Sequence, residues 1–125
     1  MGRKILVVDD SMIVRVMLKK ILILSGIKIS EIAEAANGVV AYDLLKNEKV
    51  SLLMTDINMP EMDGIALISK VREEEELKEI PIIIISSHGG EKMDKELEGK
   101  NIFGYIKKPF IHEDIRELVN KCLGE

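Results

Sequence analysis

Three aspartates stand directly after two apolar runs in this sequence. Asp9 and Asp10 follow the run Ile5–Val8, and Asp56 follows the run 51–55. Charge at the end of a buried strand costs free energy unless a cation is bound beside it. Carboxylate oxygens are typical ligands of hard divalent cations such as Mg²⁺. The three acids therefore predict a metal site, and Mg²⁺ is the expected ion.

Two further polar residues occupy equivalent positions along the chain. Ser86 ends the run that begins at Ile82, and Lys108 follows the last short apolar run. In an open sheet of parallel strands, ligands bind outside the carboxyl ends of the strands. A structural role could be argued for any one of these five polar residues. Their recurrence at one expected edge of the sheet favours a functional site.

Short apolar runs alternate with longer segments of helical periodicity, which is typical of βα units and a parallel sheet covered on both faces. The expected strands are Lys4–Val8, Glu31–Ala35, Leu52–Thr55, Ile82–Ser86 and Tyr105–Lys107. The expected helices are Met12–Ser25, Val39–Asn47, Ile65–Glu75, Glu91–Glu98 and Glu113–Leu123. Ser11 is expected to cap the first helix and Gly26 to end it. The sequence thus predicts an α/β fold with five strands and five flanking helices.

Composition excludes several classes of protein. The chain has 125 residues, one ordinary domain, and a net charge of -4 without a basic block, so we expect no direct contact with nucleic acid. No apolar run reaches the roughly 18 residues of a membrane span, and no signal peptide precedes the first strand. A single cysteine, Cys122, excludes an internal disulfide. We therefore expect a cytoplasmic protein, and a monomer.

Four motifs in register resemble those of a known family. They are Val7-Val8-Asp9-Asp10-Ser11, Thr55 to Gly64, Ile85-Ser86-Ser87 and Lys107-Lys108-Pro109-Phe110. The chain is similar to the receiver domains of two-component response regulators, of the single-domain CheY-like type. The resemblance spans essentially the whole chain and implies a flavodoxin-like sheet with the strand order 2-1-3-4-5. Residues 1–125 are accordingly expected to form a single receiver domain with no output domain.

The resemblance also assigns roles at the metal site. Asp56 is similar to the phosphoryl acceptor of the family. Asp9 and Asp10, together with Asp56 and the backbone carbonyl of Asn58, are similar to its Mg²⁺ ligands. A carboxylate that attacks a phosphoryl group meets charge repulsion, and a bound cation lowers it. The implied function is acceptance of a phosphoryl group from a histidine kinase in a Mg²⁺-dependent reaction.

Three more residues receive roles from the same resemblance. Lys108 is similar to the lysine that pairs with a phosphoryl oxygen, and its bond to Pro109 is expected to be cis. Ser86 and Tyr105 are similar to the pair whose movement switches partner binding; Tyr105 could instead pack in the core. The implied partners are a sensor histidine kinase or a histidine phosphotransfer protein, and a downstream protein target. The domain would catalyse only its own phosphorylation and slow dephosphorylation.

Two other classes share part of this chemistry. An aspartyl-nucleophile phosphatase of the haloacid dehalogenase type would need Asp-x-Asp after the first strand, whereas Asp9 and Asp10 are adjacent. A flavodoxin relative would need a Ser/Thr/Gly-rich phosphate loop at that place and an aromatic sandwich for the flavin ring, and the chain has no tryptophan. Turnover of a phosphate monoester would identify the phosphatase, and a coloured purified protein would identify the flavodoxin relative.

The first expected helix carries apolar residues on two sides. At 100° per residue, one set is expected to face the sheet, and it comprises Val14, Met17, Leu18, Ile21 and Leu24. Met12, Val16 and Ile23 fall on the outward side, among Arg15, Lys19 and Lys20. Scattered apolar residues on a surface need no explanation. The hypothesis drawn from this stripe is that it docks a helical partner, such as the histidine-bearing helices of a sensor kinase.

Overall fold

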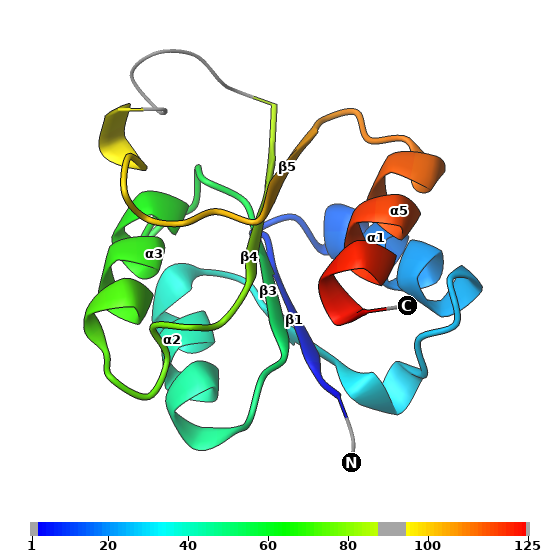
Figure 1. The fold of residues 1–125 in the computed structure, drawn as a ribbon. Coiled ribbons are helices and arrows are strands. Elements are labelled where there is room, and N and C mark those ends of the chain that lie inside the picture. Colours follow the sequence, from blue (N-terminus) through cyan, green and yellow to red (C-terminus); the bar gives the residue numbers. More distant parts are fainter. Residues whose placement is uncertain (1–2, 88–94, 125) are drawn as a thin grey trace.

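The chain folds around one parallel sheet of five strands. The computed structural model describes residues 3–87 and 95–124. The strands are β1 (Ile5–Val8), β2 (Ile32–Ala35), β3 (Leu52–Thr55), β4 (Ile82–Ser86) and β5 (Gly104–Lys107). They lie in the order β2-β1-β3-β4-β5, and all neighbouring pairs are parallel (Figure 1). The predicted architecture and strand order are confirmed.

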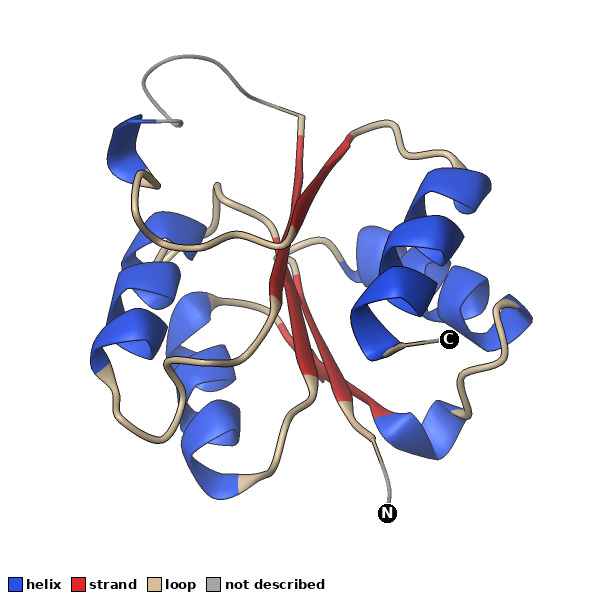
Figure 2. Ribbon diagram, viewed as in Figure 1, coloured by secondary structure: helices blue, strands red, loops and turns tan. Residues whose placement is uncertain are grey.

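Helices cover both faces of this sheet (Figure 2). The α-helices are α1 (Met12–Leu24), α2 (Gly38–Asn47), α3 (Gly64–Glu73) and α5 (His112–Leu123), and a 3-10 turn, η1 (Ile29–Glu31), precedes β2. The described part of the chain thus contains four α-helices rather than the predicted five. Half of the remaining prediction, Glu91–Glu98, cannot be compared, because 91–94 lie outside the described residues; 95 and 96 are helical. None of the described helices is long and apolar enough to span a bilayer.

Alternating strand residues divide the core into two layers. Leu6, Val8 and Leu53 pack beneath α2 and α3. Ile5 and Val7 point to the other side, beneath α1 and α5. Successive side chains of a strand alternate between faces, so strands buried on both faces must be apolar throughout. This explains why the apolar runs located the strands so closely.

Three helices begin at the sheet edge where the parallel strands end, and each has a side-chain cap. Ser11 Oγ accepts from the Val14 N–H at 3.3 Å, and Asn37 Oδ1 accepts from the Val40 N–H at 2.9 Å. Asp63 caps α3 in the same manner. A cap of this kind contributes about 1 kcal/mol by satisfying an unpaired N–H group. The caps fix the starts of α1, α2 and α3 next to the predicted site.

The predicted buried face of α1 was partly wrong. Leu22 is fully buried beside Leu18, whereas Met17 and Leu24 are exposed. The prediction placed Arg15 on the outward side, but that side chain is only 15% exposed, because it pairs with Glu34 of β2. The burial pattern shows that the helix is rotated about its axis relative to the expected orientation, with Leu22 in the core and Leu24 outside it.

This rotation can be tested by truncating two leucines of the same helix. Leu22→Ala should lower the free energy of unfolding by about 2–5 kcal/mol, because it leaves a cavity between helix and sheet. Leu24→Ala should change it by less than about 0.5 kcal/mol, because Leu24 is 65% exposed. Urea denaturation of the two variants measures both values. A larger loss for Leu24→Ala than for Leu22→Ala would restore the orientation expected from periodicity.

Candidate functional site

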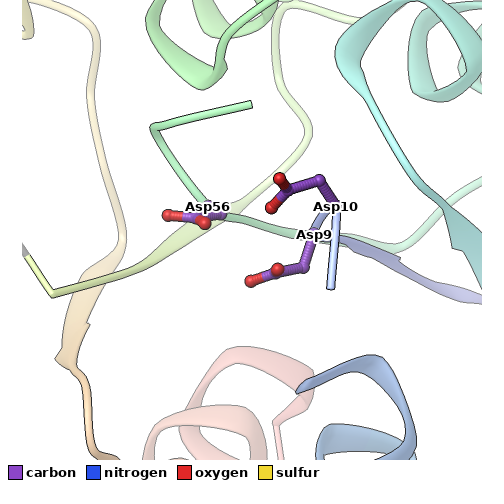
Figure 3. Close-up of side chains that lie close together, drawn as sticks. All are labelled: Asp9, Asp10 and Asp56. Atoms are coloured by element: carbon purple, nitrogen blue, oxygen red, sulfur yellow. The ribbon is translucent and has the colours of Figure 1, made fainter. Parts of the chain in front are cut away.

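The three predicted aspartates come together at the carboxyl ends of β1 and β3. One carboxylate oxygen of each residue lies within 4.8 Å of the others. Figure 3 shows Asp9 and Asp10 side by side at the end of β1, with Asp56 opposite them. Asp9 and Asp56 are buried, whereas Asp10 is exposed. The convergence expected from the sequence is therefore confirmed.

Lys108 joins two of these carboxylates. Its Nζ donates to Asp9 Oδ2 at 2.8 Å and to Asp56 Oδ2 at 3.1 Å. The Lys108 N–H donates to the carbonyl of Ser86 at 2.9 Å, so the end of β4 holds the lysine backbone. The bond between Lys108 and Pro109 is cis, as expected. Burial lowers the pKa of Lys108, but its hydrogen bonds to both carboxylates outweigh burial, and the pKa is raised.

Asp56 carries a charge that its surroundings disfavour. The residue is 7% exposed, and burial raises its pKa. The Ile57 N–H, which donates to Asp56 Oδ1 at 2.7 Å, and Lys108 both act in the opposite direction, while the charge of Asp9 adds to the rise. The pKa of Asp56 therefore stays above its ordinary value. A cation beside the carboxylate would favour its ionised form.

The loop that follows Asp56 is held by backbone contacts at two glycines. The Gly64 N–H donates to the carbonyl of Ile57 at 2.8 Å, and a Cβ at Gly64 would lie 2.8 Å from Ile57 Cα. The Gly38 N–H donates to the carbonyl of Met62 at 3.0 Å. The starts of α2 and α3 thus fix both ends of the loop. The sequence analysis did not predict these close backbone approaches.

The remaining predicted site residues lie around this cluster. Ser86 is buried at the end of β4, and Asn58 is exposed two residues after Asp56. Tyr105 is 51% exposed on β5, so the alternative of simple core packing is wrong. The ligand role of the Asn58 carbonyl and the switch roles of Ser86 and Tyr105 stay predictions.

One polar residue near the acids was missed. Arg15 of α1 donates from Nη1 to the backbone carbonyl of Asp9 at 2.7 Å and from Nε to Glu34 Oε1 at 3.0 Å. The signal that could have identified it is its position four residues after the helix cap Ser11, one turn from the site. Its acidic partner lies on another strand, and no local pattern indicates that pairing.

The predicted docking residues on α1 are exposed. Met12, Val16 and Ile23 all present their side chains to solvent. Ile13, Met17 and Leu24 of the same helix are exposed as well, and we call these six residues the α1 apolar face. More apolar side chains of α1 are thus exposed than the sequence analysis expected. Exposed apolar surface is one feature of interaction sites.

The three acids form a cluster that could hold a divalent cation. All three acids offer oxygen ligands at converging positions, and the hard-ligand set fits Mg²⁺. Lys108 adds one positive charge in contact with both Asp9 and Asp56. Such a site can bind an anionic group with three negatively charged oxygens, as in a phosphoryl group.

Comparison with known proteins identifies the class. Residues 5–120 match the model of the response regulator receiver domain. The chain belongs to this family, whose members are the signalling modules of two-component systems. It therefore belongs neither with the haloacid dehalogenase phosphatases nor with the flavodoxins.

Individual relatives cover nearly the whole chain. A chemotaxis protein CheY homolog of Campylobacter jejuni is 41% identical over 122 residues, which cover 97% of this chain and 92% of that protein. The chemotaxis protein CheY1 of Helicobacter pylori is 39% identical, with 97% of each chain covered. The structure of chemotaxis protein CheY4 of Vibrio cholerae matches with a TM-score of 0.87 at 26% identity, covering 98% of this chain and 99% of that one.

The raised pKa of Asp56 predicts a dependence of stability on pH. A carboxyl group whose pKa is higher in the folded state favours folding when protonated, and that contribution is lost as pH rises through the folded pKa. Asp56→Asn should therefore raise the free energy of unfolding at pH 7 without added Mg²⁺. The gain should shrink as the pH falls toward the ordinary carboxyl value of 3.8. Urea denaturation across this pH range measures it.

Two controls make this result specific. Asp43→Asn removes an exposed carboxylate on α2 and should give no such gain at pH 7. Added Mg²⁺ should stabilise the wild-type protein more than Asp56→Asn, because a ligand of the folded state raises its stability. A lower stability of Asp56→Asn at pH 7 would contradict the assignment of a net unfavourable charge.

Proposed function

We propose that this protein is a phosphorylation-controlled regulator of a two-component system, in which Asp56 accepts a phosphoryl group. The donor is the phosphohistidine of a sensor histidine kinase or a histidine phosphotransfer protein. The observation that carries the proposal is the convergence of Asp56 with Asp9 and Asp10, where Lys108 contacts both Asp9 and Asp56. Residues 1–125 act in this proposal as one receiver domain, and its location in the cytoplasm stays a prediction.

The transfer requires little covalent chemistry from the protein. A carboxylate oxygen of Asp56 attacks phosphorus in line with the phosphorus–nitrogen bond of phosphohistidine; this bond breaks as the new oxygen–phosphorus bond forms. The donor imidazole keeps the electron pair and takes up a proton. Lys108 neutralises one phosphoryl oxygen and is fixed for this by its contact with Asp9. Positioning and charge thus account for most of the catalysis.

The acids at the end of β1 would contribute by holding a cation beside Asp56. Asp9 and Asp10, with Asp56 and the carbonyl of Asn58, would hold Mg²⁺, which when bound neutralises phosphoryl oxygens and orients them. Adjacent water can later hydrolyse the acyl phosphate, so the phosphorylated state is transient. In this proposal the domain phosphorylates only its own Asp56 and dephosphorylates only that residue.

Phosphorylation would switch the protein through Ser86 and Tyr105. The modification adds roughly -1.5 to -2 charges and three strong acceptors. Ser86 lies at the end of β4, where its hydroxyl can donate to a new phosphoryl oxygen. Its movement would allow Tyr105 to turn inward from its exposed position on β5. A change from 1:99 to 99:1 in such an equilibrium needs about 5.5 kcal/mol, the scale of a few charge-assisted hydrogen bonds.

The α1 apolar face is the proposed docking surface for the phosphoryl donor. Met12 begins α1 two residues after Asp10, so a protein that brings phosphohistidine to Asp56 also covers the start of this helix. Val16 and Ile23 continue the same surface away from the site. The downstream target binds elsewhere in this proposal, on the side of β5 that carries Tyr105.

Intact-mass spectrometry tests the chemistry directly. With acetyl phosphate and Mg²⁺, the wild-type protein should gain one phosphoryl group, and Asp56→Asn should gain none. Asp63→Asn is a matched control, because it removes a carboxylate from the same loop while keeping a good helix cap. It should be phosphorylated like the wild type. Equal modification of Asp56→Asn would refute the assignment of the acceptor.

Docking on α1 is tested by placing a charge on its apolar face. Val16→Asp should slow phosphotransfer from a phosphorylated kinase that acts on the wild-type protein by at least about tenfold, which is 1.4 kcal/mol. Phosphorylation by acetyl phosphate should be unchanged, because that small donor needs no docking surface. Ile29→Asp adds the same charge at an exposed apolar residue near the opposite end of the sheet and should have no effect. Unimpaired transfer to Val16→Asp would rule out this surface.

A further inference from the structure

Arg15 connects the start of α1 to the backbone of the metal site. Its guanidinium donates at once to the Asp9 carbonyl, at 2.7 Å, and to Glu34 Oε1, at 3.0 Å. The planar fork of arginine can hold two such acceptors in a fixed geometry. With its side chain 15% exposed, Arg15 is more enclosed than a solvated surface arginine. The residue therefore bridges the end of β1 and the side chain of Glu34 on β2.

Glu34 holds this guanidinium from the other side. Its β2 position is paired with Val7 of β1, so it lies on the sheet face that α1 covers with apolar residues. An acid on such a face needs partners. Glu34 Oε2 also accepts from Lys19 Nζ at 2.6 Å, and these bonds, the one from Lys19 first, lower the pKa of Glu34 despite burial. Glu34 thus stays ionised and anchors Arg15.

The contact with Arg15 completes the fixation of Asp9. The Asp9 N–H donates to the carbonyl of Ala35 at 3.1 Å. Its side chain accepts from the Ser11 N–H at 2.9 Å and from Lys108 Nζ at 2.8 Å. The carbonyl held by Arg15 belongs to the peptide group that links Asp9 to Asp10. Fixing this peptide determines where the exposed side chain of Asp10 begins.

We infer that Arg15, anchored by Glu34, is a positioning residue that orients the Asp9–Asp10 peptide for Mg²⁺ binding. The inference rests on the magnesium site of the proposed function. Residues that orient metal ligands typically change metal affinity by 10- to 100-fold when replaced. The sign of the effect is diagnostic. Arg15 is a cation near the site, so simple Coulomb repulsion predicts that its removal tightens Mg²⁺ binding, whereas loss of positioning weakens it.

Isothermal titration calorimetry with MgCl₂ alone, at fixed pH and ionic strength, measures the effect without any phosphoryl donor. Arg15→Gln should weaken Mg²⁺ binding about tenfold. Lys20→Gln removes the same charge from an exposed position of the same helix and should leave affinity unchanged or slightly tighter. Thermal unfolding establishes that both variants are folded. Unchanged or tighter binding by Arg15→Gln would overturn the inference.

A second pair of variants serves if Arg15→Gln does not fold. Glu34→Gln leaves Arg15 in place but removes its anchoring charge, and Glu31→Gln removes an equal charge from η1, where it pairs with Arg3. Glu34→Gln should weaken Mg²⁺ binding more than Glu31→Gln; equal effects would overturn the inference. If the wild-type protein binds no Mg²⁺, the proposed function fails and the role of Arg15 fails with it. If the wild-type protein binds Mg²⁺ and Arg15→Gln binds it with the same affinity, only the positioning role of Arg15 fails.

Discussion

The repulsion between Asp9 and Asp56, and the positive charge that offsets it, is the constraint on which the rest of the structure depends. Two buried carboxylates at neighbouring strand ends are unfavourable by themselves. Lys108 lies between them although it is 99 residues away from Asp9 in sequence. The strand order β2-β1-β3-β4-β5 places β1 next to β3. Because the strands are parallel, the end of β5, which leads to Lys108, lies at the same edge of the sheet as the ends of β1 and β3. The sheet can thus be understood as the scaffold of one charge cluster.

Much of this arrangement follows from local patterns in the sequence. Apolar runs locate strands that are buried on both faces, and residues that end parallel strands share an edge. The acids at Asp9, Asp10 and Asp56 are predicted on that basis. The adjacency of β1 and β3 has a different origin, since no local pattern specifies which strands pair. The family resemblance implies that adjacency, and the observed register confirms it.

The errors concern α1, where two basic side chains that were expected to face solvent are partly enclosed. Helical periodicity weighs apolar residues and treats arginine and lysine as solvent-facing. In the fold, Arg15 and Lys19 both reach Glu34, and the helix turns so that Leu22 is buried instead of Leu24. The acidic partner is supplied by a separate strand 19 residues after Arg15. A non-local ion pair of this kind leaves no periodic signal, so both the helix orientation and the residue beside the metal site were missed together.

The orientation of the helices adds a second, weaker electrostatic contribution at the same edge. In a parallel α/β sheet, each helix runs opposite to the strands, so α1, α2 and α3 begin where the strands end. The N-terminus of a helix carries a partial positive charge that falls off within about one turn. The first turns of these three helices contain no acidic residue, but acids lie beside two of the starts: Asp63 caps α3, and Asp9 Oδ1 accepts from the N–H of Ser11, the cap of α1. These helix starts therefore add a weak positive contribution at this edge of the sheet, while Lys108 and the three acids determine the charge around Asp56.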